Sequence, residues 1–274
     1  MKILRFLDEQ AQQHFGCRHE DGSVTRLTGD LFGTLEDSGD AIEPRKLLAP
    51  VVPATILCIG LNYAQHAAEG GKLTPQYPVL FMKTPAAANH PGDAIVLPRR
   101  LRSDQVDYEA ELAVVISKSC KNVGRDEALD HVLGYTCGND VSARDWQHHL
   151  GGGQWCRGKT FDTFAPLGPY LVTADEIPDP NTLSIQTTLN GQLMQDGHTS
   201  DMIFDVPTLI EFLSASTTLV PGTVIMTGTP HGVGVARKPP VFLTHGDTVT
   251  VEIEKIGQLT NPVVQEDNQD SIGP

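Results

Sequence analysis

Several absences in this sequence of 274 residues limit what kind of protein it can be. No segment reaches the run of about 18 apolar residues that a membrane-spanning helix needs, so no membrane partner is expected. Lysine and arginine number 20 against 34 aspartates and glutamates, and the net charge of −14 leaves no positive field for a nucleic-acid backbone. An anionic ligand would therefore have to be attracted by a local cation, either a basic side chain or a metal ion.

Cysteine is also scarce. The five cysteines form no C-x-x-C pair, which excludes a zinc ribbon, and their odd number predicts reduced thiols. The segment Met1–Gln10 has no apolar run of about 7–15 residues, so we expect neither a secretory signal nor a transit peptide. Together these features predict a cytoplasmic protein.

Strand patterns dominate the chain and helices are few. Strands are predicted at Lys2–Leu7, His14–Arg18, Ser23–Leu27, Thr55–Ile59, Val79–Met82, Val106–Ile116, Leu133–Thr136, Tyr170–Val172, Leu183–Leu193 with a break at Asn190-Gly191, Thr223–Thr227 and Thr248–Ile256. Helices are predicted at Asn62–Glu69, Asp126–Val132, Ser142–His148 and Val206–Ser214. Because the strands come in runs, the pattern favours an α+β, mainly β fold, a mixed β-roll, over a doubly wound sheet.

We expect two folded parts and a tail. Residues 1–50 are predicted to form a small β-rich N-terminal domain. The polar stretch Gly29–Arg45 and the prolines Pro50 and Pro53 separate it from a larger domain, residues 51–264. Residues 265–274 are predicted to be a flexible polar tail.

The segment Val106–Ile116 carries acids at alternate positions of an otherwise apolar strand: Asp107, Glu109 and Glu111. In a strand, alternate side chains project from one face, with consecutive acids about 7 Å apart. At that distance two of them could reach one cation. Like charges so placed repel each other unless something positive lies between them. A solvent-exposed polar face on an edge strand explains the segment equally well, and both interpretations stay open.

A second group of polar residues follows the next apolar strand, at its predicted junction with a helix. Asp140 could supply a third carboxylate, and an all-oxygen set of Glu109, Glu111 and Asp140 suits Mg²⁺, Mn²⁺ or Ca²⁺ rather than zinc. Arg144 and Gln147, at i+4 and i+7 from Asp140, would share its helical face and could contact a ligand beside the ion. An ordinary surface ion pair is the alternative for Arg144.

The predicted helix that begins at Asn62 ends in Gly70 and Gly71. His66 and Glu69 lie at i and i+3, so the carboxylate can orient the imidazole as a general base requires. The two glycines would allow this segment to move as a lid. The alternative is an ordinary surface helix stopped by glycine.

The segment Gly153–Thr160 satisfies the P-loop formula G-x-x-x-x-G-K-T, but its context fails. A phosphate loop needs a helix after it, and Pro166 and Pro169 prevent one. We therefore expect no nucleotide site, and Lys159 is interpreted as a single cation near the acid-rich segments.

A glycine-rich turn, Gly228–Gly234, follows the apolar strand that ends near Thr227. Its backbone N–H groups, with the Thr229 hydroxyl beside them, could approach an anion, although a tight structural turn is an equal alternative. Arg237 stands where a dinucleotide fingerprint needs its third glycine, so a Rossmann site is excluded. No G-x-S-x-G nucleophile elbow is present.

Taken in order, five segments across about residues 55–260 resemble the fumarylacetoacetate hydrolase family. They are Gly60–Glu69, Asp107–Leu112, Gly138–Asp145, Arg157–Asp162 and Gly228–Gly234. A further run, Gly234–Leu243, resembles the branch of this family called domain-containing protein two. Five motifs in the same order are far more specific than any one of them.

The resemblance implies a set of roles for these residues. It implies Glu109, Glu111 and Asp140 as ligands of Mg²⁺ or Mn²⁺, with Ca²⁺ as a substitute in crystals, and His66 with Glu69 as a catalytic dyad on a lid. Lys159 would be catalytic beside them. Arg144, Gln147, Thr229 and Gly228 would bind the substrate. The implied fold is the family's mixed β-roll, usually a homodimer.

The resemblance also implies the chemistry: a small 2-oxo acid that binds the ion and passes through an enolate. Hydrolysis of a C–C bond in an acylpyruvate is the first prediction, and oxaloacetate tautomerisation or decarboxylation is the alternative. The parent enzyme has a longer N-terminal domain and a further upstream Asp ligand, which argues against fumarylacetoacetate as substrate. A noncatalytic protein that binds small acids or Ca²⁺ is the interpretation from another class.

Overall fold

Strand β11 (Ala110–Ile116) lies at the centre of the structure and is buried along its whole length. Leu112 and Val114 pack into one apolar cluster, whereas Ala113 and Val115 pack into another. A strand buried on both faces carries a continuous apolar run, which is the pattern seen here. The sheet around β11 is therefore the frame that positions everything else.

The computed structural model describes residues 1–267, whose strands form two large sheets and one two-stranded pair. The larger sheet has the order β4-β3-β2-β1-β14-β12-β11-β17-β6-β7, with β5 on β1 and β8 on β14. Its strands besides β11 are β1 (Lys2–Leu7), β2 (Gln13–Arg18), β3 (Val24–Gly29), β4 (Leu35–Ala41), β5 (Lys46–Leu48), β6 (Thr55–Gly60), β7 (Val79–Lys83), β8 (Ala88–Asn89), β12 (Val132–Asn139), β14 (Ala165–Thr173) and β17 (Thr223–Met226). The second sheet, in spatial order, contains β16 (Gln192–His198), β15 (Ser184–Leu189), β18 (Thr248–Ile253), β19 (Gly257–Gln265) and β9 (Ile95–Leu97), and the pair is β10 (Val106–Asp107) with β13 (Ser142–Ala143).

Helices are short and cover the sheets only in part. The α-helices are α1 (Ala64–Glu69), α2 (Cys156–Lys159) and α3 (Val206–Ser214), and η3 (Trp146–Leu150) is a π-helix. The 3₁₀ segments are η1 (Pro85–Ala87), η2 (Arg125–His131), η4 (Ala174–Glu176), η5 (Thr199–Asp201) and η6 (Gly234–Ala236). Within residues 1–267, none of the helices is long and apolar enough to cross a membrane. The predominance of strands in mixed sheets confirms the predicted α+β, mainly β class.

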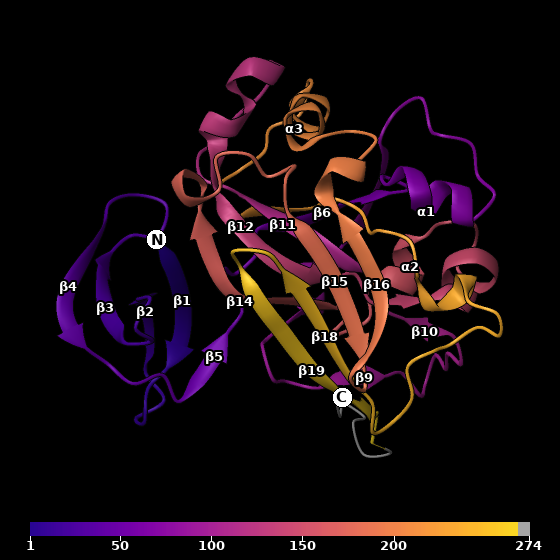
Figure 1. Cartoon of the computed structure of the whole chain (residues 1–274), viewed down its shortest axis with the longest axis horizontal. Helices are drawn as coiled ribbons and strands as arrows, with labels where there is room; N and C mark the ends of the chain where they lie inside the picture. The colour runs from indigo at the N-terminus through magenta and orange to yellow at the C-terminus, as the bar shows by residue number, and fades with distance from the viewer. Residues whose placement is uncertain (268–274) are drawn as a thin grey trace, which may run out of the picture.

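The N-terminal strands extend the central sheet. Strand β1 pairs with β14, so the antiparallel strands β1–β4 continue the large sheet on the side away from α1 and α2 (Figure 1). Strand β4 lies in the polar stretch that the sequence predicted as a separator, and β5 lies just after it. The sequence pattern missed β4 because this strand is exposed on nearly every residue and carries no apolar alternation. The domain boundary near residue 50 stays a prediction.

Four predicted elements differ from the structure. The predicted strand Val106–Ile116 is interrupted at residues 108–109, and the predicted helix Ser142–His148 begins instead as strand β13 and continues as the π-helix η3. The helix predicted at Asp126–Val132 is the 3₁₀ segment η2, and the strand predicted at Thr248–Ile256 ends at Ile253. In the predicted tail, Gln265 closes β19 and Glu266 N donates to Leu97 O, while 268–274 lie outside the described residues.

Candidate active site

Three carboxylates meet where β11 begins and β12 ends. Antiparallel pairing places Ala110 opposite Asn139, and Asp140 N donates to Glu109 O over 2.9 Å. Glu109, Glu111 and Asp140 are all buried, and one carboxylate oxygen from each lies within 4.8 Å of the others. The structure therefore brings together the three residues predicted as metal ligands.

Buried basic side chains face these acids. Lys159 Nζ lies 2.6 Å from Glu109 Oε2 and 2.7 Å from Asp140 Oδ2. Arg144 Nη2 lies 2.7 Å from Glu109 Oε1. Lys83 Nζ lies 2.6 Å from Asp140 Oδ1. Sequence reasoning missed Lys83, although a lysine at the end of a short apolar strand is a signal that could have marked it.

The opposite charges fix the ionisation of Glu109 and Lys159. Burial raises the pKa of Glu109, but the charges of Arg144 and Lys159 outweigh it and hold this pKa well below its usual value. Burial lowers the pKa of Lys159, and the charges of Asp140 and Glu109 outweigh it, so that the net shift is upward. Lys159 is therefore a charged ammonium at neutral pH that can stabilise negative charge but cannot act as a base.

Glu111 has the opposite environment. Desolvation first, and then the charges of Asp140 and Glu109, raise its pKa well above the usual value, although Gly228 N donates to Glu111 Oε2 over 2.8 Å. Two negative neighbours in one buried group make either a proton or a cation necessary at this position.

The donor set fits a hard divalent cation. Asp140 Oδ1 is buried 2.6 Å from the Lys83 ammonium, which also donates to the carbonyl oxygens of Val141, Lys159 and Phe164. Around the site the buried acids outnumber the buried bases, four to three: Asp107, Glu109, Glu111 and Asp140 against Lys83, Arg144 and Lys159. An excess negative charge and an all-oxygen set of three buried carboxylates suit Mg²⁺ or Mn²⁺.

The ionisation of Glu111 leads to a prediction on stability. In the metal-free protein its raised pKa means that the folded state holds a proton that the unfolded state releases above about pH 4.5, so stability falls as pH rises from there towards the raised pKa. Glu111→Gln removes this cost. In chelator at about pH 8 we expect the variant to unfold about 2–4 °C above the wild type, a difference that shrinks towards about pH 5. Thermal unfolding across pH measures it, and parallel curves for the two proteins would contradict it.

Asp107 does not belong to the carboxylate group, which corrects the expectation that alternate acids share one face. The ladder is interrupted at residues 108–109, so Asp107 turns instead to Arg144, accepting from its Nε over 2.9 Å, and to the backbone N–H groups of Gly234 and Val235. Arg144 Nη1 in turn donates to Gln147 Oε1 over 3.0 Å. Arg144 and Gln147 therefore lie together, but not on the predicted helical face shared with Asp140, because Arg144 follows strand β13 and Gln147 lies in the π-helix η3.

Helix α1 carries the predicted dyad and touches the glycine-rich turn. His66 Nδ1 lies 3.4 Å from Glu69 Oε2, and Gly232 N donates to both carboxylate oxygens of Glu69 over 3.0 and 3.1 Å. Burial raises the pKa of Glu69, but hydrogen bonds from His66 and Gly232 outweigh it and the net shift is downward, so the carboxylate stays charged. The same turn reaches the acidic group, because Gly228 N donates to Glu111 Oε2 over 2.8 Å.

The turn after β17 is built around Gly228. Its φ of +97° is a left-handed conformation that favours glycine, and a Cβ there would lie 2.7 Å from Asn62 Cβ. Gln195 Nε2 donates to Thr229 Oγ1 over 2.8 Å and to Pro230 O over 2.9 Å. Sequence reasoning missed Gln195, since nothing in the hairpin sequence marks one glutamine of β16 as fully buried.

The P-loop formula does not build a P-loop. Its last residues form α2, which has four residues, the π-helix η3 precedes it, and strand β14 follows. The Lys159 ammonium is held by Glu109 and Asp140.

We therefore expect no nucleotide binding. A calorimetric titration with ATP and Mg²⁺ should give heats of dilution only, because the lysine that would meet the phosphates already has two carboxylate partners. Saturable binding at micromolar concentration that disappears in Lys159→Ala would refute this expectation.

Comparison with known proteins identifies the class. Residues 55–264 match the model for the fumarylacetoacetate (FAA) hydrolase C-terminal family, so the chain belongs to the fumarylacetoacetate hydrolase family. Members of this family are enzymes that act on small molecules, and this chain is an enzyme of that kind. The noncatalytic alternative is thereby set aside, whereas the roles of the individual site residues stay predictions.

Named relatives refine the picture. The chain is 51% identical over 219 residues to a mitochondrial oxaloacetate tautomerase of Xenopus laevis, covering 80% of this chain and 68% of the relative. It is 49% identical over 218 residues to a mitochondrial oxaloacetate tautomerase of Homo sapiens, covering 79% of this chain and 69% of that protein. These relatives support the resemblance to the domain-containing protein two branch.

Solved structures agree in fold. A fumarylacetoacetate hydrolase from Exiguobacterium antarcticum superposes with a TM-score of 0.87 at 37% identity, over 97% of this chain and 100% of the other. A 5-carboxymethyl-2-hydroxymuconate delta-isomerase from Mycobacterium smegmatis superposes with a TM-score of 0.84 at 40% identity, over 97% of this chain and 100% of the other. The fold predicted from the sequence is therefore confirmed as the fumarylacetoacetate hydrolase type.

Proposed function

We propose that this protein is a divalent-metal-dependent oxaloacetate tautomerase that interconverts the keto and enol forms of the acid. The observation that carries the proposal is a buried carboxylate group with a charged Lys159, joined to the His66–Glu69 dyad by one turn: Gly228 N donates to Glu111 and Gly232 N donates to Glu69. The names of the two tautomerase relatives support this substrate.

The donor set described above is the proposed site of the ion. Glu109, Glu111 and Asp140 would hold Mg²⁺ or Mn²⁺, which when bound would supply electrophilic stabilisation of negative charge on the substrate's keto oxygen. Lys159, kept charged by its two carboxylates, would add a fixed positive charge at the same place. Arg144 and Gln147, with Thr229 and the backbone of Gly228, would bind the carboxylates of the substrate.

The dyad would move the proton. His66 would take a proton from the carbon beside the carbonyl and return one to oxygen, or the reverse, while the charged Glu69 stabilises the imidazolium that forms in between. One base is enough for this exchange, whereas hydrolysis also requires an activated water. The contact of Glu69 with Gly232 holds α1 against the turn and so fixes the position of the dyad.

A substrate panel tests the proposal against the first prediction made from sequence. We expect the enzyme to speed the loss of ultraviolet absorption by the enol form of oxaloacetate, relative to the reaction without enzyme. Chelator should abolish this activity, and Mg²⁺ or Mn²⁺ should restore it. Acylpyruvate hydrolysis and oxaloacetate decarboxylation both release pyruvate, which a coupled assay detects. Pyruvate release that is faster than tautomerisation would refute the tautomerase and support the hydrolase or the decarboxylase.

Three further expectations remain proposals. We propose a homodimer, for which light scattering should give about twice the chain mass of 29.6 kDa. The relatives are named as mitochondrial, so cytoplasmic location needs direct imaging. Absence of nucleic-acid binding follows from the charge of −14 and is tested by a gel-shift titration.

A further inference from the structure

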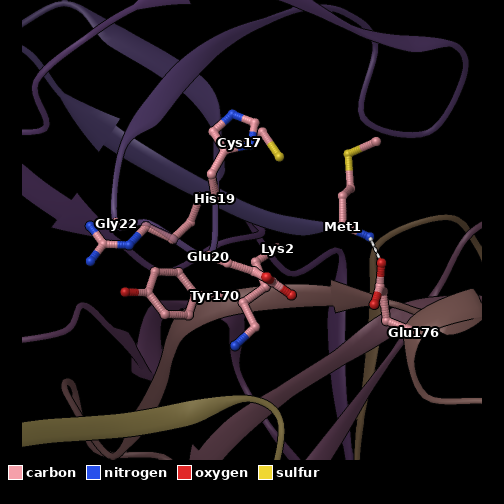
Figure 2. Close-up of a pocket in the computed structure, with 9 residues that line it drawn as sticks. Met1, Lys2, Cys17, His19, Glu20, Gly22, Tyr170 and Glu176 are labelled. Atoms are coloured by element: carbon pink, nitrogen blue, oxygen red, sulfur yellow. Dashed lines mark hydrogen bonds and ion pairs between the residues drawn. The ribbon is translucent and has the colours of Figure 1, made fainter.

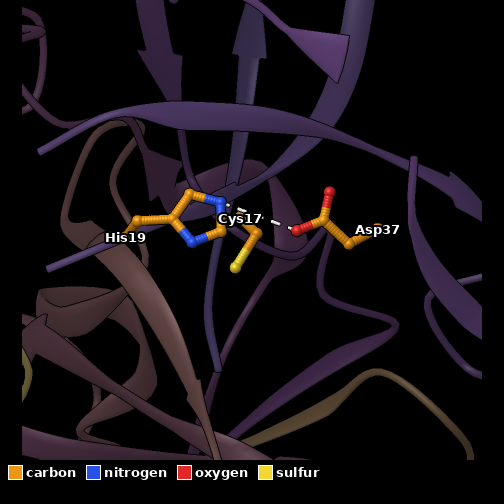
Figure 3. Close-up of side chains that lie close together, drawn as sticks. All are labelled: Cys17, His19 and Asp37. Carbon is orange, nitrogen blue, oxygen red and sulfur yellow. Dashed lines mark ion pairs between the residues drawn. The ribbon is translucent and has the colours of Figure 1, made fainter. Parts of the chain in front are cut away.

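Three side chains of different chemistry converge in the N-terminal part of the sheet: Cys17, His19 and Asp37. One ligand atom from each, a sulfur, a ring nitrogen and a carboxylate oxygen, lies within 4.8 Å of the others. Figure 3 shows the Cys17 thiol between the His19 ring and the Asp37 carboxylate, and a dashed line joins the ring to the carboxylate. This thiol–imidazole–carboxylate group lies in strands β2–β4 and the adjoining turn, away from α1 and α2 (Figure 1).

Strand geometry explains the convergence. Cys17 in β2 and His19 just beyond its end are two residues apart, so their side chains share a face. A register shift between β3 and β4 brings Asp37 beside them, and its Oδ2 accepts from Thr25 Oγ1 over 2.8 Å. His19 Nε2 lies 2.7 Å from Thr25 Oγ1 and 3.5 Å from Asp37 Oδ2.

The donor set differs in kind from that of the active site. Thiolate and imidazole ligands suit zinc and related transition ions, whereas three carboxylates suit Mg²⁺ or Mn²⁺. In a tetrahedral zinc site the ligand atoms lie about 3.3–3.8 Å apart, given zinc–ligand distances of about 2.0–2.3 Å. The ligand atoms here, within 4.8 Å of one another, would have to approach by about 1 Å to reach these separations. The His19 and Asp37 side chains are 38% and 34% exposed, so rotation about their side-chain bonds can bring the atoms together.

The group also has an open side. Cys17 and His19 line a cleft of about 490 Å³ together with the terminal Met1, Lys2 and Glu20. Figure 2 shows the Cys17 sulfur next to the His19 ring, and the Met1 amino group paired with Glu176 on another side of the cleft. The cleft gives an ion a way in and leaves room for a water molecule as fourth ligand.

We propose that Cys17, His19 and Asp37 form a second metal site, selective for a borderline divalent ion such as Zn²⁺, with water in the fourth position. On binding, the Cys17 S–H bond breaks, its proton leaves to solvent, and a metal–sulfur bond forms. No electron is transferred. Since its ligands come from β2, β4 and the turn after β2, the ion ties the exposed strand β4 to the sheet.

Cobalt tests the proposal independently of catalysis. Tetrahedral Co²⁺ bound to a thiolate gives a sulfur-to-metal charge-transfer band in the near ultraviolet, which an all-oxygen site cannot give. With Mg²⁺ in excess, we expect this band to saturate at one Co²⁺ per chain and to be abolished by equimolar Zn²⁺. Zn²⁺ should also raise the thermal unfolding midpoint by several degrees.

Matched variants locate the site. Cys17→Ser should lose the band, whereas Cys156→Ser, which removes the partly exposed cysteine of α2, should keep it. Asp37 is exposed, so Asp37→Asn should leave the protein folded. This substitution should weaken Zn²⁺ binding at least about tenfold. Neither Cys17→Ser nor Asp37→Asn should alter Mg²⁺-dependent tautomerase activity. The metal-site proposal can therefore fail without the proposed function failing, and the reverse. Absence of the band, its survival in Cys17→Ser, or unchanged affinity in Asp37→Asn would overturn the proposal.

Discussion

Glu109→Gln is expected to lower the turnover number for oxaloacetate at least about 10²-fold while the protein stays folded. Glu109 contacts Arg144 and Lys159 at once and is one of the three proposed ligands of the ion. Glutamine keeps the shape but removes the charge, so the ion is held more weakly and Lys159 is drawn towards Asp140. Steady-state kinetics over a range of Mg²⁺ concentrations measures the loss.

Stability separates this result from simple unfolding. Removing one partner of a buried ion pair costs about 3–5 kcal/mol when the other charge is left alone. Here Lys159 keeps Asp140 and Arg144 keeps Asp107, so the cost should be well below that range. Asp140→Asn should lose activity similarly, and exposed Glu9→Gln serves as control. Wild-type turnover in fully chelated enzyme would contradict the metal hypothesis altogether.

The carboxylate group could be predicted from sequence because two short-range rules combine there. Acids inside an apolar run mark Glu109 and Glu111 as special, and Asp140 follows the next apolar strand, which pairs with the first. Neighbouring strands of an antiparallel pair bring such positions within a few ångströms. The same rule misplaced Asp107, because a period of two holds only while the chain stays in the ladder.

Other features depend on contacts between distant parts of the chain. Lys83 reaches Asp140 from β7, and Gln195 reaches Thr229 from a different sheet. Strand β1 meets β14 at Ile3 and Leu171, a pairing with no local pattern to announce it. A π-helix likewise has no periodicity that a short sequence window can show. Sequence patterns therefore identified the clustered acidic side chains better than the residues that hold them in place.

His66→Ala is expected to lower turnover by about 10²–10⁴, the range for loss of a general acid or base, with little change in the affinity for oxalate. Oxalate would present two oxygens to the ion, as the enolate would, and the proposed ligands of that ion are Glu109, Glu111 and Asp140 rather than His66. Gln65→Ala, an exposed neighbour on the same helix, is the matched control and should remain fully active. Kinetics with the best substrate and calorimetry with oxalate measure the two quantities.

Glu69→Gln should show the same separation more mildly. Glutamine can still accept the hydrogen bonds from His66 Nδ1 and from Gly232 N, so α1 stays on the turn, but the charge that stabilises the imidazolium is lost. Turnover should therefore fall less than in His66→Ala, and oxalate affinity should again be kept. If both variants turned over at the wild-type rate, α1 would be an ordinary surface helix and the base would have to be sought elsewhere. Lys159 would not replace it, because its two carboxylate partners keep it protonated.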